Sequence, residues 1–340
     1  KDEAFSWWKI YLKFNSRAGL VSRGHLKSAL FVQQSLSEAE ARETLIKLPS
    51  IYDEPFADSS AIPLYIVSRV ARSHVTVALS GDGGDELFAG YSTYPLLARM
   101  LPLLKVPGFL KQLASMGIAV GGSSKMKKHI DLLRCDELWQ LFLYLNERTI
   151  AKSPDVEKLL NHSIHRSLND TEYVAAFQRT QNAGALNSCF YAEAKTYLVD
   201  DILTKVDRAS MAVSLETRIP FLDYRIAEYA MGLSASVKMG KYGGARKVIL
   251  RRLLARYLPT ELFERPKRGF SVPLARWLRG ELRWLVEEHL DSGRLKQEGL
   301  FNVPFVEQLV AEHMSGSRDR EAVLWALIFW QMWRKERNVN

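Results

Sequence analysis

The sequence contains little cysteine and no long apolar run. Its two cysteines, Cys135 and Cys189, form no CxxC pair and no cysteine-histidine ligand spacing. This excludes a zinc site of the ribbon or finger type and favours reduced core thiols over a disulfide. No apolar stretch reaches the roughly 18 residues of a membrane-spanning helix, and the N-terminus lacks the basic-then-apolar order of a signal peptide. We therefore predict a cytoplasmic protein without a membrane partner.

The basic charge of the chain is concentrated in one stretch. The net charge is +9, from 47 basic and 38 acidic residues in 340, and 47% of the residues are hydrophobic, enough for a sizeable core. Residues 246–279 contain ten Lys or Arg and only two Glu. This pattern indicates a local surface for phosphate or nucleic acid, or simply a solvated helix face. No base-reading motif accompanies the charge, so nucleic acid is the least favoured partner.

One segment has the pattern of a parallel α/β unit. Residues 61–71 have helical spacing, residues 75–79 form a short apolar run, and Gly81, Gly83 and Gly84 follow at once. A helix, a buried strand and a glycine turn in this order are typical of a parallel sheet with crossover helices.

The rest of the chain is predicted to be mostly helical. Helical periodicity extends over residues 96–198, with breaks near Pro107, residues 121–124 and Pro154, and further helices are expected at 198–214, after Gly244 and at 305–334. The last section is rich in aromatic residues, which we interpret as core: Trp325, Phe329, Trp330 and Trp333.

The turn SGDGGDELFAGY, residues 80–91, has the residue types of a nucleotide site. Ligands of a doubly wound sheet bind beyond the carboxyl ends of its strands, glycines allow close approach, and N–H groups at a helix start favour an anion. The carboxylates of Asp82, Asp85 and Glu86 tolerate phosphate only with a cation such as Mg²⁺ between them. Capping of the next helix by Asp85 and Glu86 explains these acids equally well. No GKS or GKT follows, so the turn is not a Walker A loop.

The run at 80–91 resembles the second signature of the glutamine-hydrolysing asparagine synthetase family. Four further stretches are similar to the family in the same order, over about residues 37–334: YDEPFADSSAIPLYIVSR (52–69), KVDRASMAVSLETRIPFLD (205–223), ARKVILRRLLARYLP (245–259) and ERPKRGFSVPLARWLRG (264–280). The resemblance implies the α/β class, with an adenine-nucleotide α-hydrolase-like parallel sheet, truncated here, and a large, mostly helical C-terminal part. It assigns residues 36–340 to an ATP-dependent synthetase domain, incomplete on its N-terminal side, and leaves residues 1–35 unassigned.

The resemblance also implies an activity. The family amidates aspartate with ATP and Mg²⁺ through β-aspartyl-AMP, and a glutaminase domain supplies the ammonia. By resemblance, the nucleotide is bound at Ser80, Gly81 and Gly83, the metal at Asp85, and the catalytic residues are Asp82, Lys247, Asp200 and Asp201, with the last two not distinguished by the alignment.

The chemistry of several of these residues has two explanations. Attack of a carboxylate on the α-phosphorus brings two anions together, so a fixed cation lowers the barrier. Lys247 continues the apolar stripe of its helix, which we predict to be buried, and its ammonium either enters a cleft or snorkels to solvent. Asp200 and Asp201 either serve the amide-forming step or cap a helix, as Asp58 does for the 61–71 helix. Four nearby cations either hold pyrophosphate or are solvated: Lys241, Arg251, Lys267 and Arg268.

Two parts of the family pattern are not found in these residues. The first cysteine is Cys135, so we expect no glutaminase activity from this polypeptide. No SGGxDS loop occurs in residues 1–34. In the family this loop supplies the second acid that binds magnesium together with the acid at the position of Asp85. We therefore expect weak ATP binding and slow turnover. Amidation of another carboxylate, such as a sugar acid, and an inactive fragment or pseudoenzyme remain alternatives. A homodimer is compatible with the sequence.

Overall fold

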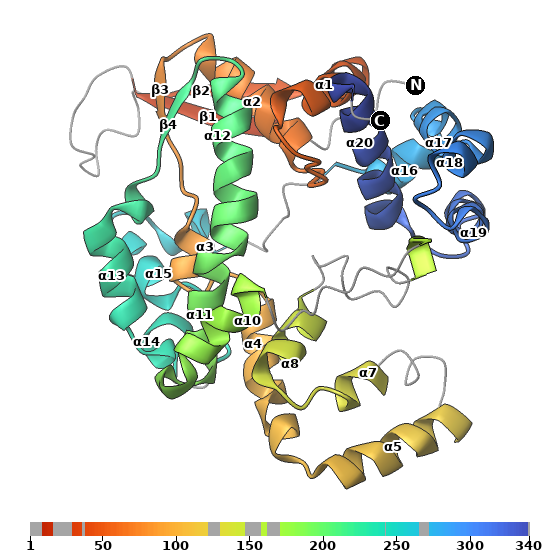
Figure 1. The fold of residues 1–340 in the computed structure, drawn as a ribbon. Coiled ribbons are helices and arrows are strands. Elements are labelled where there is room, and N and C mark those ends of the chain that lie inside the picture. The colour runs from red at the N-terminus through yellow and green to blue at the C-terminus, as the bar shows by residue number, and fades with distance from the viewer. Residues whose placement is uncertain are drawn as a thin grey trace.

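The computed structural model is predominantly helical (Figure 1). It describes residues 9–15, 29–35, 38–121, 130–146, 158–161, 171–241, 243–264 and 272–338, with the backbone alone for residues 9–15, 29–35 and 38. Lys267, Arg268 and Pro154 therefore lie outside the described residues.

Two small sheets are present in the described residues. Strands β1 (Lys9–Asn15) and β2 (Ala29–Ser35) form an antiparallel pair. Strands β3 (Val77–Leu79) and β4 (Glu216–Arg218) pair in parallel, with Val77 opposite Glu216. The predicted parallel sheet is thus present as two strands. Strand β3 begins two residues later than predicted, because the Val75 N–H still bonds to the carbonyl of Ala71 at the end of the preceding helix, at 2.9 Å.

Helices form most of the described chain. Those of the first half are α1 (Glu38–Ile51), α2 (Ala61–Arg72), α3 (Gly84–Leu87), α4 (Thr93–Met100), η3 (Leu101–Lys105), α5 (Gly108–Gly121), α7 (Ile130–Leu133) and α8 (Leu138–Leu145). The middle of the chain forms α10 (Glu172–Arg179), η6 (Gln181–Ala183), α11 (Ala185–Lys195), η7 (Leu198–Leu203), α12 (Thr204–Met211), η8 (Pro220–Leu222), α13 (Tyr224–Gly232) and α14 (Ala235–Met239). The remainder forms α15 (Val248–Leu254), η9 (Thr260–Leu262), α16 (Leu274–Arg279), α17 (Arg283–His289), α18 (Ser292–Glu298), α19 (Val303–Met314) and α20 (Glu321–Arg337).

Three predicted helices differ in detail from those observed, whereas the one at 61–71 is confirmed as α2. The helix expected at 198–214 is a π-helical turn, η7, followed by α12. The helix after Gly244 begins only at Val248, because Lys247 has a left-handed backbone with φ of 50°. The section at 305–334 is two helices, α19 and α20, separated by a turn in which Gly316 has φ of 72°.

The largest hydrophobic core joins the two ends of the described chain. Helices α1 and α2 pack with α16 to α20 in the upper part of Figure 1. Trp325 and Phe329 are buried there, and Trp330 and Trp333 pack against them, which confirms their predicted role as core residues. The Trp333 indole N–H donates to the carbonyl oxygen of Tyr52 at 3.2 Å, and so ties the C-terminal helix to the end of α1.

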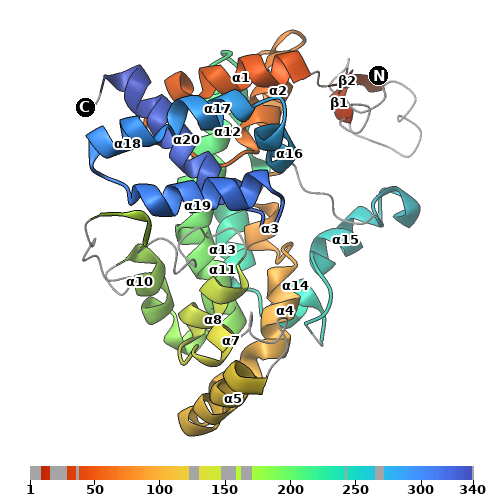
Figure 2. The same cartoon turned by 90° about the vertical axis from the view of Figure 1, so that its right-hand side faces the viewer.

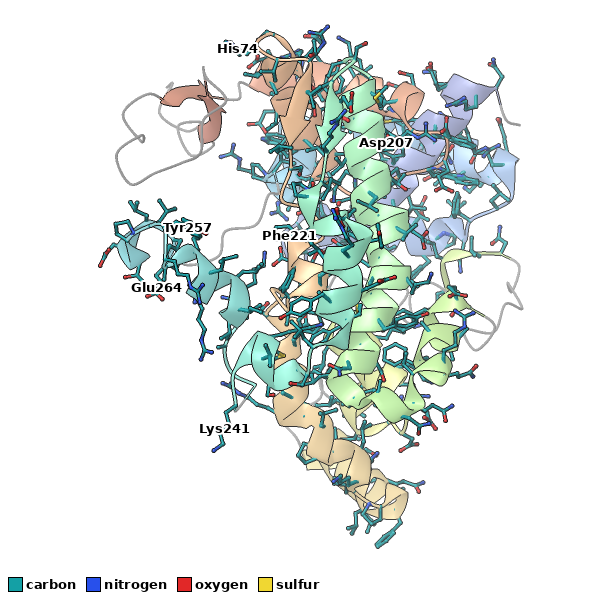
Figure 3. The ribbon with its side chains drawn as sticks, turned by 90° about the vertical axis from the view of Figure 1, so that its left-hand side faces the viewer. His74, Asp207, Phe221, Lys241, Tyr257 and Glu264 are labelled. Carbon is teal, nitrogen blue, oxygen red and sulfur yellow. The ribbon has the colours of Figure 1, made fainter. Side chains whose placement is uncertain are left out.

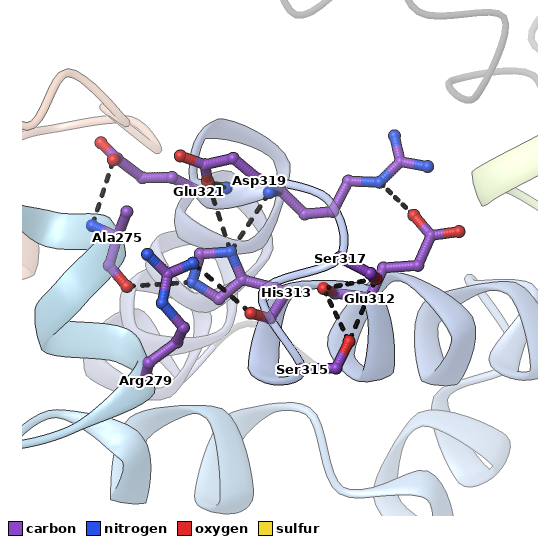
Figure 4. A network of polar contacts seen from close by, with 9 residues as sticks. Ala275, Arg279, Glu312, His313, Ser315, Ser317, Asp319 and Glu321 are labelled. Atoms are coloured by element: carbon purple, nitrogen blue, oxygen red, sulfur yellow. Dashed lines mark hydrogen bonds and ion pairs between the residues drawn. The ribbon is translucent and has the colours of Figure 1, made fainter.

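A buried histidine fixes the contact between α16 and α19 (Figure 4). His313 Nε2 lies 3.2 Å from the carbonyl oxygen of Ala275, and Nδ1 accepts from the Arg320 N–H at 3.1 Å. A carbonyl can only accept and a backbone N–H can only donate, so the ring carries its proton on Nε2 and is neutral. Burial lowers the pKa of His313, in agreement with this state. The hydrogen bonds of His313 therefore stabilise the packing of α19 against α16.

A second core is formed by α4, α8, α10 and α11. Both cysteines are buried in it and unbridged, as predicted. Its polar centre is the carboxylate of Glu193, which is 1% exposed and accepts hydrogen bonds from Tyr94 and Asn146. This core lies below the strands in Figure 1 and holds α11 against α3.

No single helix in the described part of the chain is long and apolar enough to cross a membrane. The helical stretches 93–105 and 108–121 together satisfy the length and composition of a span, but they meet at a bend of 110°.

Candidate functional site

The turn after β3 is held by the neighbouring strand. The Ser80 N–H donates to the carbonyl of Arg218 at 2.9 Å, which places Ser80 at the carboxyl end of the parallel pair, as predicted. The Ser80 hydroxyl donates to the carboxylate of Asp82. These contacts order the start of the turn. The helix expected after the turn is α3, which has only four residues, so a single turn sums few peptide dipoles at its N-terminus.

Two of the predicted nucleotide-binding glycines have different surroundings. Gly83 has φ of 75°, and a Cβ there would lie 2.8 Å from Leu222 Cδ2. The left-handed backbone favours glycine at this position, and a larger residue would also displace the end of the Leu222 side chain. A Cβ on Gly81 would meet no atom within 4 Å. The backbone at Gly81 is open to an approaching molecule, and nucleotide contact there stays a prediction.

The turn brings together two residues predicted from distant motifs. Lys247 Nζ lies 3.0 Å from Asp85 Oδ1, and the two side chains are 32% and 30% exposed. Lys247 adopts a left-handed backbone directly before α15. Strained backbone of this kind persists only where the surroundings enforce it, and it clusters at functional sites. Its ammonium faces Asp85, so the solvated alternative for Lys247 is wrong.

Sequence reasoning missed Gly90, which makes room for this ion pair. A Cβ on Gly90 would lie 1.7 Å from Asp85 Oδ1 and 2.3 Å from Lys247 Cε. The Gly90 N–H also donates to the Asp85 carbonyl at 2.8 Å, and the preceding Ala89 has φ of 56°. The available signal was the glycine near the end of SGDGGDELFAGY, a type of residue that marks close approach of other atoms.

The ion pair forms the charged end of a pocket of about 580 Å³ under α15. Its other walls are largely apolar and are formed by Phe221, Leu250, Leu253, Leu254, Tyr257 and Phe263. Arg246 and Arg251 also line it, so of the four predicted auxiliary cations Arg251 is near the site. Lys241 is exposed and points away from the body at the lower left of Figure 3.

The apolar stripe of α15 was predicted to be buried, and this is wrong. None of its residues is buried, and Leu253 is 46% exposed. Phe221 lies on the body and Tyr257 on the projecting segment in Figure 3, and both line the pocket. The stripe therefore faces partly a small core, against which Ile249 and Leu250 pack, and partly the pocket. Amphipathic spacing alone does not encode this division.

The π-helical turn η7 contains the two aspartates expected to assist amide formation. Asp200 is exposed, and Asp201 Oδ1 lies 3.1 Å from Lys205 Nζ. The residue at the N-cap of α12 is Leu203, so neither aspartate caps that helix. Burial raises the pKa of Asp201 to about 6, and Lys205 only partly opposes this. A carboxylate with a pKa near neutrality is able to exchange protons at physiological pH.

Lys205 is shared between Asp201 and a second acid, a network that sequence reasoning did not anticipate. Its ammonium also pairs with Asp58, in the loop before α2. Burial opposes ionisation of Asp58, but Lys205 and hydrogen bonds from Ser60 outweigh it and hold the pKa of Asp58 below its usual value. The Asp58 carboxylate accepts a hydrogen bond from the Ser60 N–H, as a residue preceding a helix often does. Its main partner, however, is Lys205, far along the chain.

The predicted site residues thus form three local groups. Asp85 and Lys247 meet at the pocket, Ser80 and Asp82 bond to each other, and Asp201 joins Lys205. In the part of the chain that the structure describes, none of the contacts above joins the third group to the first.

Asp85 is the residue of the predicted site that suits Mg²⁺. Across the described ranges, no three His, Cys, Asp or Glu side chains gather to hold a metal. Mg²⁺ is commonly bound by one or two carboxylates together with phosphate oxygens and water. Asp85 fits as one such carboxylate, since it is partly exposed and faces the pocket.

Comparison with known proteins gives a consistent result. The family model described as asparagine synthase matches residues 29–335. Asparagine synthetase (glutamine-hydrolyzing) 1 of Bacillus subtilis is 29% identical over 309 residues, which are 90% of this chain and 48% of that protein. A protein of Mycobacterium tuberculosis, provisionally named asparagine synthetase (glutamine-hydrolyzing), is 34% identical over 304 residues, 86% of this chain and 45% of its own length.

These matches lead to a family of ATP-dependent ligases with the adenine-nucleotide α-hydrolase fold. The chain belongs to the asparagine synthase family. It spans about half the length of the curated relatives that it matches.

Proposed function

We propose that this chain supplies part of the site at which a carboxylate, most simply that of aspartate, is activated with ATP and converted to an amide. The observation that carries the proposal is the Asp85 to Lys247 ion pair, 3.0 Å long, at the charged end of the pocket. An acid that can hold a metal beside a fixed cation suits a reaction in which negative charge develops on phosphate.

In the proposed first step, an oxygen of the substrate carboxylate forms a bond to the α-phosphorus of ATP. The bond from that phosphorus to the bridging oxygen breaks, and pyrophosphate leaves. Lys247 stabilises the charge on the phosphoryl oxygens. Asp85 would hold Mg²⁺, which would supply neutralisation of the phosphate charge when bound. Ser80, Gly81 and Gly83 position the nucleotide at the end of β3.

In the proposed second step, the nitrogen of ammonia bonds to the activated acyl carbon, and the bond from that carbon to the AMP oxygen breaks. The nitrogen loses a proton in this step, so a nearby base is required. Asp82 and Asp201 are the candidates for the base. Asp201 is favoured by its raised pKa, about 6, and Asp82 by its place in the turn beside Ser80. Glutamine serves as the ammonia source only through a glutaminase domain.

The proposal is tested by measuring pyrophosphate release from ATP with aspartate and ammonium chloride, using the purified protein. Lys247→Met and Asp85→Asn should each lower the rate of release by about 100-fold or more. Arg252→Met is the matched control, since Arg252 is an exposed cation of the same helix that does not line the pocket. Full release by Lys247→Met would reject the proposed role of the ion pair.

The same assay identifies the carboxylate. Aspartate is compared with a sugar acid such as glucuronate under identical conditions. If only the sugar acid supports release, the sugar acid is the substrate in place of aspartate, and the two proposed steps are unchanged. Absence of release with any carboxylate, together with absence of Mg-ATP binding by calorimetry, would favour an inactive relative.

A further inference from the structure

Two hydrogen bonds close the segment from Asp85 to Tyr91 on itself. The Gly90 N–H donates to the Asp85 carbonyl at 2.8 Å, and the Tyr91 hydroxyl donates to the carboxylate of Glu86, which is 1% exposed. Buried carboxylate oxygens need hydrogen-bond donors, so this bond fixes the direction in which the Tyr91 ring leaves the segment. The Tyr91 ring therefore keeps a defined position relative to Asp85.

The ring of Tyr91 contacts a second tyrosine at the start of η7. The ring centroids of Tyr91 and Tyr197 are 6.1 Å apart and the ring planes meet at 70°, an edge-on geometry that aromatic pairs prefer. Tyr197 is half-buried and directly precedes η7. Nearby, the Tyr94 hydroxyl donates to the Glu193 carboxylate of α11. Two tyrosines that follow the glycine turn thus hold it against α11 and the start of η7.

Tyr197 is connected to Asp201 by continuous helical backbone. The Thr196 N–H donates to a carbonyl of α11 at 3.1 Å, and the Thr196 carbonyl accepts from the Asp200 N–H at 2.8 Å. The π-helical form of η7 is rare and is often found at functional sites. Figures 1 and 2 both show α3 beside the column that α11 and α12 form. The tyrosine contact therefore joins the turn after β3 to the element that carries Asp201.

The other side of η7 is held by charged groups. Lys205, one helical turn after Asp201, pairs with both Asp201 and Asp58. The Tyr52 hydroxyl donates to the Lys205 carbonyl at 3.3 Å. These contacts fix Asp201 against the loop before α2, and the tyrosine pair adds a contact toward the turn after β3. The acid is thus held from two directions.

We propose that Tyr197 is a positioning residue for amide formation: its ring, seated against Tyr91, holds Asp201 in place relative to the ion pair at the pocket. The inference rests on the proposed function. In its second step, the ammonia nitrogen bonds to the acyl carbon, a proton passes from that nitrogen to the Asp201 carboxylate, and the bond from carbon to the AMP oxygen breaks. A base on a separate element serves this step only if its distance from the acyl group is fixed.

The alternative base does not need this contact. Asp82 lies in the turn after β3 and accepts from the Ser80 hydroxyl, so its position is set within the turn itself. If Asp82 takes the proton, removal of the Tyr197 ring should leave amide formation unchanged. The role of Tyr197 therefore also decides between the two acids.

Single-turnover kinetics of the purified protein test the proposal, with ATP, ammonium chloride and the carboxylate that supports pyrophosphate release. Tyr197→Leu removes the ring and Tyr197→Phe keeps it. Tyr144→Leu is the matched control, because Tyr144 is a half-buried tyrosine that packs against the second core. We expect Tyr197→Leu to slow amide formation about tenfold or more while pyrophosphate release stays within about twofold, and both rates to stay within about twofold in the other two variants.

A double-variant cycle separates positioning from simple packing. If Tyr197 acts through Asp201, the Tyr197→Leu change should slow amide formation no further in protein that already carries Asp201→Asn. Two independent effects would instead multiply. Thermal unfolding shows that each variant is folded at the assay temperature, and Tyr197→Met, which fills more of the space, replaces Tyr197→Leu if the latter does not fold.

Three results would overturn the role of Tyr197. One is unchanged amide formation in Tyr197→Leu, and another is equal slowing of both steps, which is what a loss of packing alone produces. The third is multiplication of the two effects in the cycle. If the parent protein releases no pyrophosphate with any carboxylate, the proposed function itself is rejected, and the role of Tyr197 with it.

Discussion

Lys247 and Asp85 meet in the lining of the pocket, and Gly90 is the residue that lets them do so. The ion pair is 3.0 Å long and about two thirds buried, and the Gly90 backbone lies directly against both side chains. The pair joins the turn after β3 to the start of α15.

Loss of the lysine should affect catalysis far more than stability. Lys247→Met is expected to lower kcat for pyrophosphate release by about 100-fold or more, the usual cost of removing a group that stabilises transition-state charge. The ion pair is partly solvated, so the free energy of unfolding should change by about 1 kcal/mol or less. Steady-state kinetics and urea unfolding measure the two effects. A large loss of stability with unchanged kcat would assign Lys247 a structural role.

Gly90→Ala should disturb the ion pair by steric overlap. The added methyl group would lie 1.7 Å from Asp85 Oδ1, so the carboxylate or the backbone must move. We expect a destabilisation of about 1–3 kcal/mol together with reduced activity. Gly81→Ala is the control for stability, because a Cβ there meets nothing within 4 Å. Equal stability of the two variants, measured by thermal unfolding, would contradict the packing argument.

Asp201→Asn should change how stability depends on pH. The pKa of Asp201 is about 6 in the folded protein and 3.8 as the unperturbed value. Since the folded state holds the proton more tightly, the stability contributed by this group is present below pH 3.8 and is lost as the pH rises through about 6. Relative to the parent protein, the variant should therefore gain up to about 3 kcal/mol between pH 4 and pH 7.5. A pH-independent difference in urea unfolding would contradict this.

Lys238→Met should stabilise the protein at neutral pH. Lys238 is 1% exposed, lies 4.6 Å above the Phe190 ring, and has its pKa lowered by burial to about 8. Because the folded pKa is below the unfolded value, the lysine penalises folding at neutral pH, and the penalty is relieved as the pH rises from about 8 to 10.5. The variant should gain about 1–3 kcal/mol at pH 7 and less at pH 10. Lys195→Met, an exposed lysine on α11, serves as the control.

Local pattern predicted much of the fold. Helix α2, the strand and glycine turn, and the aromatic core of α20 follow from periodicity and turn residues, which act within a few positions. The π-helical turn η7 and the left-handed backbone of Lys247 were not predicted, because tertiary contacts enforce them against local preference.

The residues of the site were predicted only in part, because tertiary contacts decide which of them meet. Asp85 and Lys247 could be named from their motifs, but their contact depends on how the chain returns to the turn after β3. The sharing of Lys205 between Asp58 and Asp201 joins a loop near the beginning of the chain to η7, and no spacing in the sequence encodes that pairing. The role of Gly90 is visible only in the structure, because it depends on the side-chain atoms that pack against this residue.

Strand β3 has a consequence for the behaviour of the protein in solution. Among the described residues β3 pairs only with β4, and its Leu79 is 76% exposed. An edge strand with exposed apolar side chains can pair with strands of other molecules, although the three-residue length of β3 limits this pairing. The solubility of this protein therefore depends on what occupies that edge, and Leu79→Lys is expected to slow concentration-dependent light scattering while leaving the pocket under α15 intact.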